Sequence, residues 1–382
     1  MDDRGGLIRV HLGTTRLAQG LSGGASDGLA VYGRHLLEAL SARDDVSVTA
    51  FGFGTRDQQC AGTTIRGMPG FLPQALTALA GLDGFSALER TLEAGDLVHA
   101  TDHLIPRCRR APVIATLMDA LPLSNPEWAN PRWRRLKNIL WKRSTGWADH
   151  VIAPSKFARD QVVQHFGLPE DRVSIVPLGV DSVWFEPPDA GRMEAIRLSL
   201  NLPPRYLLFV GTLQPRKNLT GAIDAWLGLP AERRAEFPLL VVGRAGPGSQ
   251  RDLARLAKRA DDGPRWLGTL PFEQLHAALH GAAALLLPSL YEGFGLPVLE
   301  AFAAGVPVMT SQSNALGEVG GDAAWLVDPR SPAEMTAALG QILDNPGAVD
   351  AVVSRARARA QAFTWARTAN ETVAVYRRVL GT

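Results

Sequence analysis

Short apolar runs alternate with longer amphipathic stretches along the chain, and this alternation limits the possible fold more than any other feature. Runs such as 46–53, 206–210 and 283–287 are typical of buried strands in parallel sheets, where both faces are covered. The stretches between such runs, for example 29–42 and 155–165, fit the crossover helices that parallel strands require. The sequence therefore predicts an α/β fold built on parallel sheets.

The length of the chain and the grouping of these runs indicate two domains. At 382 residues, 46% of them hydrophobic, the chain is long for one domain and sufficient for two cores. The expected strands fall into two sets, 7–12, 46–53, 97–100, 112–118, 150–153 and 173–177, and then 206–210, 238–242, 265–267, 283–287, 306–310 and 324–327. Between the sets, Pro187, Pro188 and a polar stretch carry no strand signal. We therefore predict a hinge near 181–201, a first domain over 1–185 and a second over 186–364.

Charge and cysteine content exclude several classes of protein. Forty basic against 38 acidic residues give a formal net charge of +2, which is too balanced for a surface that grips nucleic acid throughout. Two cysteines, Cys60 and Cys108, cannot form a disulfide framework or a zinc cluster, so we expect a reducing compartment and no metal or other cofactor. Residues 1–4 do not resemble a signal peptide, and no apolar run approaches the roughly 20 residues of a spanning helix. We expect a cytoplasmic protein, soluble or peripheral to a membrane.

The segment between Glu292 and Glu300 is the part of the sequence that most indicates a ligand-binding or catalytic site. Gly293 and Gly295 allow close approach of the backbone to a ligand, and Pro297 suits the first turn of the helix that follows. A helix entered through a glycine loop offers unpaired N–H groups and a positive dipole end, which favour a phosphate or a polarised sugar oxygen. Ionised carboxylates accept hydrogen bonds from hydroxyl-rich partners. The structural alternative is that Glu292 caps the helix and Glu300 is solvated.

This segment resembles the signature of two glutamates separated by seven residues that marks the retaining glycosyltransferases of family 4. The match continues through 301–308 and through Gly317 and Glu318. The resemblance implies the GT-B architecture of two facing Rossmann-like domains with the active site in a central cleft. It also implies a nucleotide-sugar donor and a final helix, 365–382, that packs back on the first domain.

A second motif, 211–218, follows the first expected strand of the second domain. Loops at the carboxyl ends of parallel strands bind ligands, and the adjacent cations Arg216 and Lys217 suit a diphosphate. By resemblance, Lys217 stands at the lysine position of the family. Many members carry an arginine where this chain has Thr212, so Arg216 is our candidate for the second cation. The alternative is a solvated turn, although cations at a helix start oppose the helix dipole and call for an anion.

The resemblance places further donor contacts in loops of both domains. These expected contacts are Gly23, Gly24, Thr212, Gly243, Arg244, Leu267, Gly268, Thr269, Gly293, Phe294, Gly295 and Leu296, with Glu292 on the transferring sugar and Glu300 on the ribose hydroxyls. The alternative for the glycine loop around Gly23 is a flexible connector, and for Gly243 it is ordinary turn chemistry.

The first domain supplies the acceptor side in this resemblance. Members often have a histidine followed by an aspartate at the end of the fourth strand, where this chain has Met118 and Asp119. Asp119 is therefore a candidate catalytic residue, and His103, near the end of an earlier expected strand, is our candidate for a contact in the cleft. The structural alternative for a single histidine is a role in packing.

The segment 132–147 combines basic residues with interleaved tryptophans and leucines and has no acidic residue. This pattern resembles an interfacial helix that meets anionic lipid headgroups at the inner face of the cell membrane. Its candidate membrane or acceptor contacts are Arg132, Trp133, Arg134, Arg135, Lys137 and Trp141. The alternative is an amphipathic helix packed on the sheet through its tryptophan and leucine face.

Taken together, 211–218 and 117–128 look most like bacterial mannosyltransferases of polysaccharide and O-antigen assembly. This resemblance implies retaining transfer of mannose or a related hexose from a GDP-sugar to a lipid-linked or polysaccharide acceptor in lipopolysaccharide or exopolysaccharide biosynthesis. No local chemistry separates GDP from UDP, so a UDP-sugar-dependent transferase is an alternative. A nucleotide-sugar epimerase of similar architecture and a non-catalytic protein that binds polysaccharide or membrane are the rival hypotheses.

Overall fold

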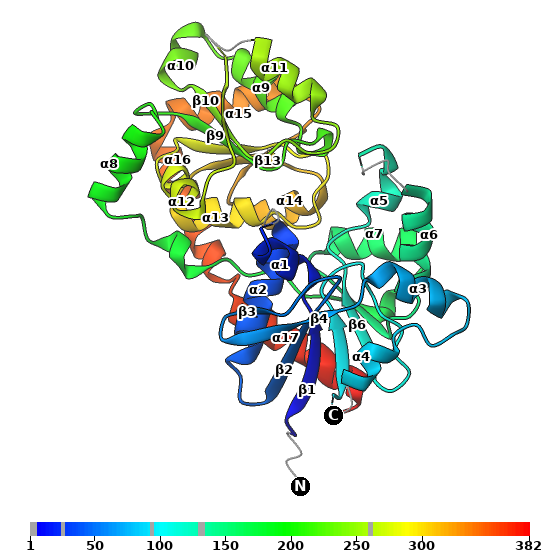
Figure 1. Cartoon of the computed structure of the whole chain (residues 1–382). Coiled ribbons are helices and arrows are strands. Elements are labelled where there is room, and N and C mark those ends of the chain that lie inside the picture. The colour runs from blue at the N-terminus through cyan, green and yellow to red at the C-terminus, as the bar shows by residue number, and fades with distance from the viewer. Residues whose placement is uncertain (1–5, 24–26, 92–94, 129–133, 259–262) are drawn as a thin grey trace. The chain divides into compact units, whose positions relative to one another are not determined.

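The computed structural model describes residues 6–23, 27–91, 95–128, 134–258 and 263–382. The chain divides into two compact units (Figure 1). Unit 1 comprises Met1–Pro126, Pro131–Gly179 and Trp365–Thr382, and unit 2 comprises Glu127–Asn130 and Val180–Thr364. Among the described residues, no helix has both the length and the apolar character that crossing a bilayer requires.

Unit 1 is built on an eight-stranded sheet in the order β3-β4-β2-β1-β5-β6-β7-β8. Its strands are β1 (Ile8–Gly13), β2 (Val46–Phe53), β3 (Gln58–Cys60), β4 (Thr63–Met68), β5 (Leu97–Ala100), β6 (Val113–Thr116), β7 (His150–Ala153) and β8 (Val173–Ile175). All neighbouring strands are parallel except β3 and β4. That antiparallel pair was not among the expected strands, because β3 is short, polar and only partly buried.

The helices of unit 1 connect these parallel strands. They are α1 (Thr15–Leu21), α2 (Gly28–Ser41), α3 (Phe71–Leu79), α4 (Ser86–Thr91), α5 (Leu121–Ser124), α6 (Arg134–Thr145), α7 (Lys156–Phe166) and α17 (Trp365–Leu380). Asp27 begins α2 by accepting a hydrogen bond from the backbone N–H of Ala30, and Ser155 begins α7 by accepting one from Ala158. Such caps satisfy N–H groups that have no partner within the helix.

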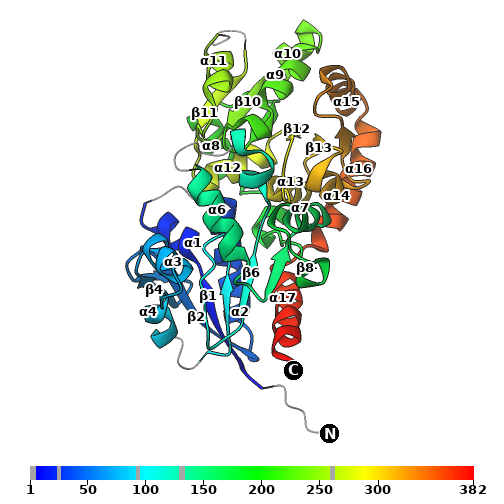
Figure 2. The same cartoon turned by 90° about the vertical axis from the view of Figure 1, so that its right-hand side faces the viewer.

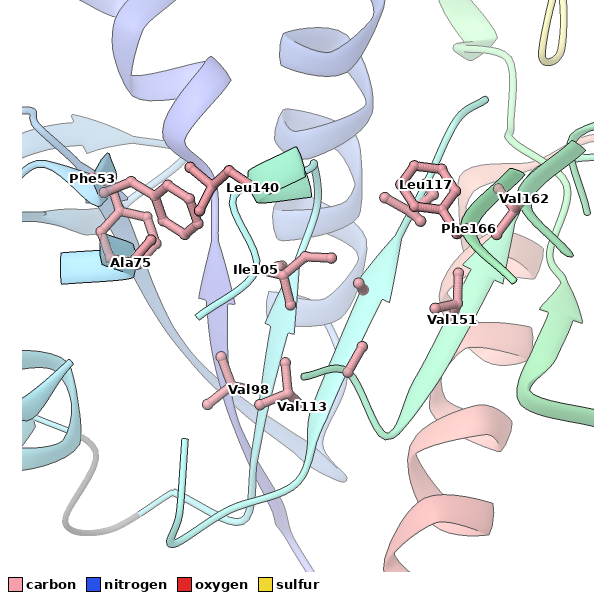
Figure 3. Packing of buried hydrophobic residues seen from close by; sticks show 14 of the residues in the cluster. Phe53, Ala75, Val98, Ile105, Val113, Leu117, Leu140, Val151, Val162 and Phe166 are labelled. Carbon is pink, nitrogen blue, oxygen red and sulfur yellow. The ribbon is translucent and has the colours of Figure 1, made fainter. Parts of the chain in front are cut away.

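The apolar runs of the sequence become the interior of unit 1. Val98, Val113 and Val151 lie on β5, β6 and β7 and belong to one core cluster with Phe53 and Phe166 (Figure 3). Burying a side chain of this kind contributes about 1.5–3 kcal/mol to the free energy of unfolding. The core therefore fixes the strand order, and the strand order fixes where the loops at the strand ends lie.

The last helix, α17, packs on unit 1 through buried polar contacts. The hydroxyl of Tyr376 lies 2.7 Å from Nδ1 of His99 on β5, and Nε2 of His99 lies 2.8 Å from Oγ1 of Thr116. Burial lowers the pKa of His99 to about 3, so this imidazole is neutral at physiological pH. At the start of α17, Trp365 stacks on His35 with ring centroids 4.8 Å apart. The end of the chain is thus part of the first unit.

Unit 2 is built on a six-stranded parallel sheet in the order β11-β10-β9-β12-β13-β14. Figure 2 labels β10, β11, β12 and β13 of this sheet. Its strands are β9 (Leu207–Val210), β10 (Leu239–Val242), β11 (Arg265–Gly268), β12 (Ala284–Leu287), β13 (Val308–Ser311) and β14 (Trp325–Val327). Its helices are α8 (Ala190–Ser199), α9 (Leu219–Leu227), α10 (Ala231–Glu236), α11 (Gln250–Lys258), α12 (Phe272–His280), α13 (Leu296–Ala304), α14 (Asn314–Gly320), α15 (Pro332–Asp344) and α16 (Pro346–Gln361). The predicted α/β class, with two parallel sheets, is confirmed.

Candidate functional site

Two loops of unit 2 meet because their strands are neighbours. The loop after β9 contains the short 3-10 helix Pro215–Lys217, and the loop after β12 leads into α13. Since β9 pairs with β12 in parallel, the carboxyl ends of both strands lie at the same edge of the sheet. The two sequence motifs, far apart in the chain, therefore come together in space.

An ion-pair cluster joins these loops. Arg216 Nη1 lies 2.8 Å from Glu292 Oε2, and Lys217 Nζ pairs with Glu292 Oε1. Ser289 donates a hydrogen bond of 3.0 Å to the same Oε1. The residues Glu292 and Lys217 are each only 8% exposed. Glu292 thus binds the buried Lys217 and the partly buried Arg216, and it is not the cap of α13, whose N-cap is Gly295.

The ionisation of Glu292 follows from these partners. Burial by itself raises the pKa of the carboxyl, but attraction to Arg216 and Lys217 outweighs burial and lowers the pKa to about 2. Glu292 is therefore ionised at neutral pH. The cluster carries two positive charges and one negative charge, which leaves a net positive charge at the edge of the sheet.

Glu300 has a different environment on α13. It is partly buried, and this burial, followed by the negative charge of Asp181, raises its pKa to about 7, although Lys217 opposes the shift. Glu300 is therefore not the solvated helix residue of the structural alternative. At neutral pH it exchanges between a protonated form that donates a hydrogen bond and an ionised form that only accepts.

Glycines determine how closely the loops approach. Gly243, after β10, has a φ of +145°, and a Cβ there would lie 1.9 Å from the carbonyl oxygen of Gly211. Contact between the two loops is therefore enough to require a glycine at this position. Gly295 has a φ of +125°, as the sequence predicted for the turn into α13. Pro297 in the first turn is also confirmed, and a left-handed Gly305 ends this helix.

The other donor contacts that were predicted in unit 2 lie along the same edge of its sheet. Thr212 is partly exposed after β9, Arg244 is exposed after β10, and Thr269 is exposed after β11. Leu267 and Gly268 end β11, Gly293 and Phe294 lie in the loop before α13, and Leu296 begins that helix. Phe294 is buried, with its ring centroid 6.1 Å from that of Phe363.

Two residues that sequence reasoning missed organise this site. Ser289 donates to Glu292, and Asn218 adopts a left-handed conformation with a φ of +57°. The amide of Asn218 accepts a hydrogen bond from Gly221 at the start of α9 and donates to the carbonyl of Pro329 at 2.7 Å. An asparagine directly before an amphipathic helix is a cap signal that could have identified Asn218.

The predicted residues of unit 1 lie at the carboxyl ends of β5 and β6. His103 stacks on Trp141 and Phe166, with ring centroids 4.9 Å and 6.0 Å away, and its Nδ1 is buried without a hydrogen-bond partner. Burial lowers the pKa of His103, and the charge of Asp119 opposes that shift. Asp119 accepts a hydrogen bond of 2.9 Å from the backbone of Leu121. Both side chains therefore take part in local packing.

Asp102, beside His103, is a polar residue that the sequence did not single out. It is 6% exposed, its Oδ1 accepts a hydrogen bond of 2.8 Å from the backbone of Leu104, and its Oδ2 has no hydrogen-bond partner. Burial raises the pKa of Asp102 to about 6, while Arg16 lowers it and Asp27 raises it to smaller extents. In this part of the chain only His103 was predicted from the sequence as a site residue.

The amphipathic helix α6 has one face on the core of unit 1 and another in solvent. Trp141, a predicted membrane or acceptor contact, is partly buried and packs against the core, and Leu140 is buried, as in the alternative of a helix packed on the sheet. Leu136, Lys137 and Ile139 are the exposed side chains on this part of α6. Gly23, with a φ of +88°, follows α1. The predicted contacts Gly24, Arg132 and Trp133, and the side chains of Arg134 and Arg135, lie outside the described residues.

Two protein families match the chain in consecutive segments. The family described as Glycosyltransferase Family 4 matches residues 26–183, and the family described as Glycosyl transferases group 1 matches residues 194–361. The O-antigen chain mannosyltransferase B of Escherichia coli is 30% identical over 285 residues, which cover 74% of each chain. The MMP alpha-(1->4)-mannosyltransferase of Mycolicibacterium hassiacum is 30% identical over 290 residues, 74% of this chain and 66% of the relative.

Solved structures resemble the whole chain. Sucrose-phosphate synthase from Thermosynechococcus elongatus has a TM-score of 0.77 at 22% identity and covers 98% of this chain and 99% of its own. The Anabaena protein HepE in complex with UDP-glucose has a TM-score of 0.71 at 17% identity, and the match covers 97% of this chain and 99% of HepE. At these identities the likeness identifies the fold, which is the GT-B arrangement of two Rossmann-like domains.

Proposed function

Because the chain belongs to glycosyltransferase family 4, we propose that it moves mannose or a related hexose from a GDP-sugar to a lipid-linked or polysaccharide acceptor, with retention of anomeric configuration. The chain is a glycosyltransferase, and its donor is a nucleotide sugar. The two mannosyltransferases at 30% identity support mannose as the transferred sugar. The structural neighbour that holds UDP-glucose keeps a UDP-sugar as the alternative donor.

The observation that carries this proposal is the cluster of Arg216, Lys217 and Glu292. In sugar transfer from a nucleotide donor, negative charge grows on the diphosphate as the glycosidic bond breaks. Preorganised cations stabilise that charge most in a site from which water is excluded. Lys217 and Arg216 are held by Glu292, which Ser289 in turn holds by a hydrogen bond, so both cations supply this stabilisation without rearranging during the reaction.

The two glutamates take different parts in this proposal. Glu292 is ionised and has lone pairs left beyond its contacts to Arg216 and Lys217, so it accepts hydrogen bonds from hydroxyls of the transferring sugar. Glu300, whose pKa of about 7 lets it donate or accept, binds the ribose hydroxyls. The loops that contain Thr212, Gly243 and the segment 267–269 surround the nucleoside.

Unit 1 contributes the acceptor side. His103 and Asp119 are the proposed polar contacts there, and the loop around Gly23 is proposed to approach the diphosphate. Lys137, Lys142 and Arg143 of α6 are exposed, and α6 has no acidic residue, so this helix is proposed to contact an anionic membrane that holds a lipid-linked acceptor.

A donor screen tests the function. Thermal unfolding is measured with GDP-mannose, GDP, UDP-glucose and UDP, because a ligand at 100 times its Kd adds about 2.7 kcal/mol to the free energy of unfolding. The expected result is a larger shift with GDP ligands, which the Lys217→Ala variant loses. Product analysis with and without a saccharide acceptor then separates transfer from epimerisation. Stabilisation by UDP ligands alone would replace the proposed donor, and conversion of the donor without an acceptor would overturn the proposed transfer.

Charge reversal tests the role of α6. Glutamate at Lys137, Lys142 and Arg143 should weaken binding to vesicles that contain phosphatidylglycerol, since each basic residue near such a surface contributes about 1 kcal/mol. Lys156→Glu is the matched control, because Lys156 is an exposed lysine on α7 of the same unit. Equal binding of both variants would contradict a role of α6 at the membrane.

A further inference from the structure

Helix α3 of unit 1 has an apolar face that the fold does not cover. Leu72 and Leu76, one turn apart, are 47% and 45% exposed, and Leu82 in the turn after the helix is 63% exposed. The opposite face, with Ala75 and Ala78, is buried in the core. The helix is therefore anchored by one face while its leucines point outward. Grouped exposed leucines of this kind mark interaction surfaces.

Basic side chains lie beside this face. Arg107 donates a hydrogen bond of 3.2 Å from Nη1 to the carbonyl of Ala78, which brings the loop 107–110 to α3. This loop is Arg-Cys-Arg-Arg, and its three arginines are exposed. Among nearby acids, Glu89 is buried and accepts a hydrogen bond of 2.6 Å from the backbone of Arg109, whereas Asp83 is exposed next to Leu82. The charge around α3 is thus mainly positive.

Helix α6 extends the same kind of surface. Figures 1 and 2 both place α3 and α6 next to each other within unit 1. Ala75 of α3 and Leu140 of α6 belong to one core cluster (Figure 3). Outward, α6 exposes Leu136 and Ile139 together with its lysines. Two neighbouring helices therefore expose apolar side chains with basic side chains beside them, from the loop 107–110 at α3 and from α6 itself.

We propose that α3, the loop 107–110 and α6 form a membrane-docking surface, in which Leu72, Leu76 and Leu82 enter an anionic bilayer while the basic side chains contact its headgroups. This inference rests on the proposed lipid-linked acceptor and names how the enzyme reaches it. In the proposed function α6 contacts the membrane by charge alone, and the additional element here is apolar insertion through α3.

The positive charge of this surface favours an anionic bilayer over a second copy of the chain as its binding partner. A symmetric dimer through this face would place arginines and lysines of one copy opposite those of the other, and like charges in contact are unfavourable. An anionic bilayer supplies an apolar interior for the leucines and negative headgroups for the cations at the depths where each is needed.

Paired serine substitutions test the surface. Leu72→Ser with Leu76→Ser is compared with Leu198→Ser, which changes an equally prominent leucine, 63% exposed, on α8 of unit 2. Binding is measured by co-sedimentation with vesicles of phosphatidylglycerol and phosphatidylcholine, and circular dichroism verifies the fold. We expect the partition coefficient of the α3 variant to fall roughly tenfold, because apolar burial is lost, while the control binds like the unchanged protein.

Salt separates insertion from attraction by charge. At high ionic strength headgroup attraction is screened, so the charge-reversed α6 variant should approach the unchanged protein, while the α3 variant should still bind more weakly. Equal vesicle binding by the α3 variant and the unchanged protein overturns the proposal. So does sedimentation velocity that shows a dimer which the serine pair dissociates. Transfer by the unchanged protein to a water-soluble acceptor tests the proposed function separately, so the two can fail independently.

Discussion

Glu292 of unit 2 and Asp102 of unit 1 are carboxylates at the carboxyl ends of parallel strands, and they are buried to the same degree, with 8% and 6% exposed. Their pKa values nevertheless move in opposite directions, to about 2 and to about 6. Glu292 has Arg216 and Lys217 in direct contact. Asp102 has one backbone N–H at Oδ1 and no partner at Oδ2.

The difference shows that burial alone does not decide whether a carboxylate stays charged. Desolvation raises the pKa at both positions, and only at Glu292 do neighbouring cations outweigh it. The edge of the unit 2 sheet is therefore arranged around charge, which suits a diphosphate. At the corresponding edge of unit 1, Asp102 has no partner of opposite charge in direct contact.

The largest effect is expected from Glu292→Gln. The amide keeps the shape of the side chain but removes the carboxylate that pairs with Arg216 and Lys217, and breaking a buried pair in this way costs about 3 kcal/mol or more. We expect a lower melting temperature, strongly reduced turnover, and a larger stabilisation by pyrophosphate than in the unchanged protein, because the anion replaces the lost charge. Thermal unfolding with and without pyrophosphate measures the melting temperature and the stabilisation by the anion, and steady-state kinetics measures turnover.

Glu236→Gln provides the matched control for that change. Glu236 also pairs with two arginines, Arg205 and Arg233, but at the surface of unit 2. Exposed pairs contribute about 0–1 kcal/mol, so this variant should melt close to the unchanged protein. If both variants melt alike, the burial of the Glu292 cluster has no energetic consequence and the comparison with Asp102 fails.

Lys217→Ala should affect catalysis more than folding. Glu292 keeps Arg216 as a partner, whereas the diphosphate loses a cation whose contribution grows as the bond breaks. We expect turnover to fall roughly 100-fold or more, as when one preorganised donor is removed from a charge-stabilising site. Steady-state kinetics with saturating donor measures this loss, and Lys156→Ala on α7 serves as control. Turnover near that of the control would remove Lys217 from the proposed mechanism.

The comparison also shows what the sequence can and cannot predict. Lys217, Arg216 and Glu292 could be grouped because each follows an apolar strand, and parallel strand ends share an edge. Asp102 could not, since its lack of a partner depends on burial in three dimensions. For Trp141 the sequence left both a membrane contact and packing on the sheet open, because periodicity shows that a helix has two faces but not which face the core covers. The antiparallel β3–β4 pair carried too little apolar character to be recognised.

Glu300→Gln should have a moderate effect that depends on pH. Since the folded protein raises the pKa of Glu300 from 4.5 to about 7, the stability it contributes is present below pH 4.5 and is lost as pH rises through 7. The variant should therefore equal the unchanged protein near pH 4.5 and exceed its melting temperature at pH 8. We also expect the KM for the donor to rise several-fold with little change in kcat, because ribose contacts are similar in the ground and transition states.

Glu334→Gln, at an exposed glutamate of α15 in the same unit, controls for the change of residue type. The donor KM of this control should stay unchanged. A fall in kcat without a change in KM for Glu300→Gln would contradict a ribose contact. A melting difference that does not vary with pH would contradict the raised pKa.

The smallest effect, with the opposite sign to that of Glu292→Gln, is expected from Asp102→Asn. The folded protein raises the pKa of Asp102 from 3.8 to about 6, so its stabilising contribution is present below pH 3.8 and is lost as pH rises through 6. The amide removes the buried charge but adds a buried N–H group that needs a partner, and this second effect offsets most of the gain. We expect the variant to be about 1 kcal/mol more stable than the unchanged protein at pH 8 and no more stable near pH 4. Thermal unfolding at both pH values measures the difference. Asp83→Asn, at an exposed carboxyl of the same unit, is the control. Loss of stability at pH 8 would mean that Asp102, like Glu292, has a charged partner in solution, and the contrast between the two strand ends would not hold.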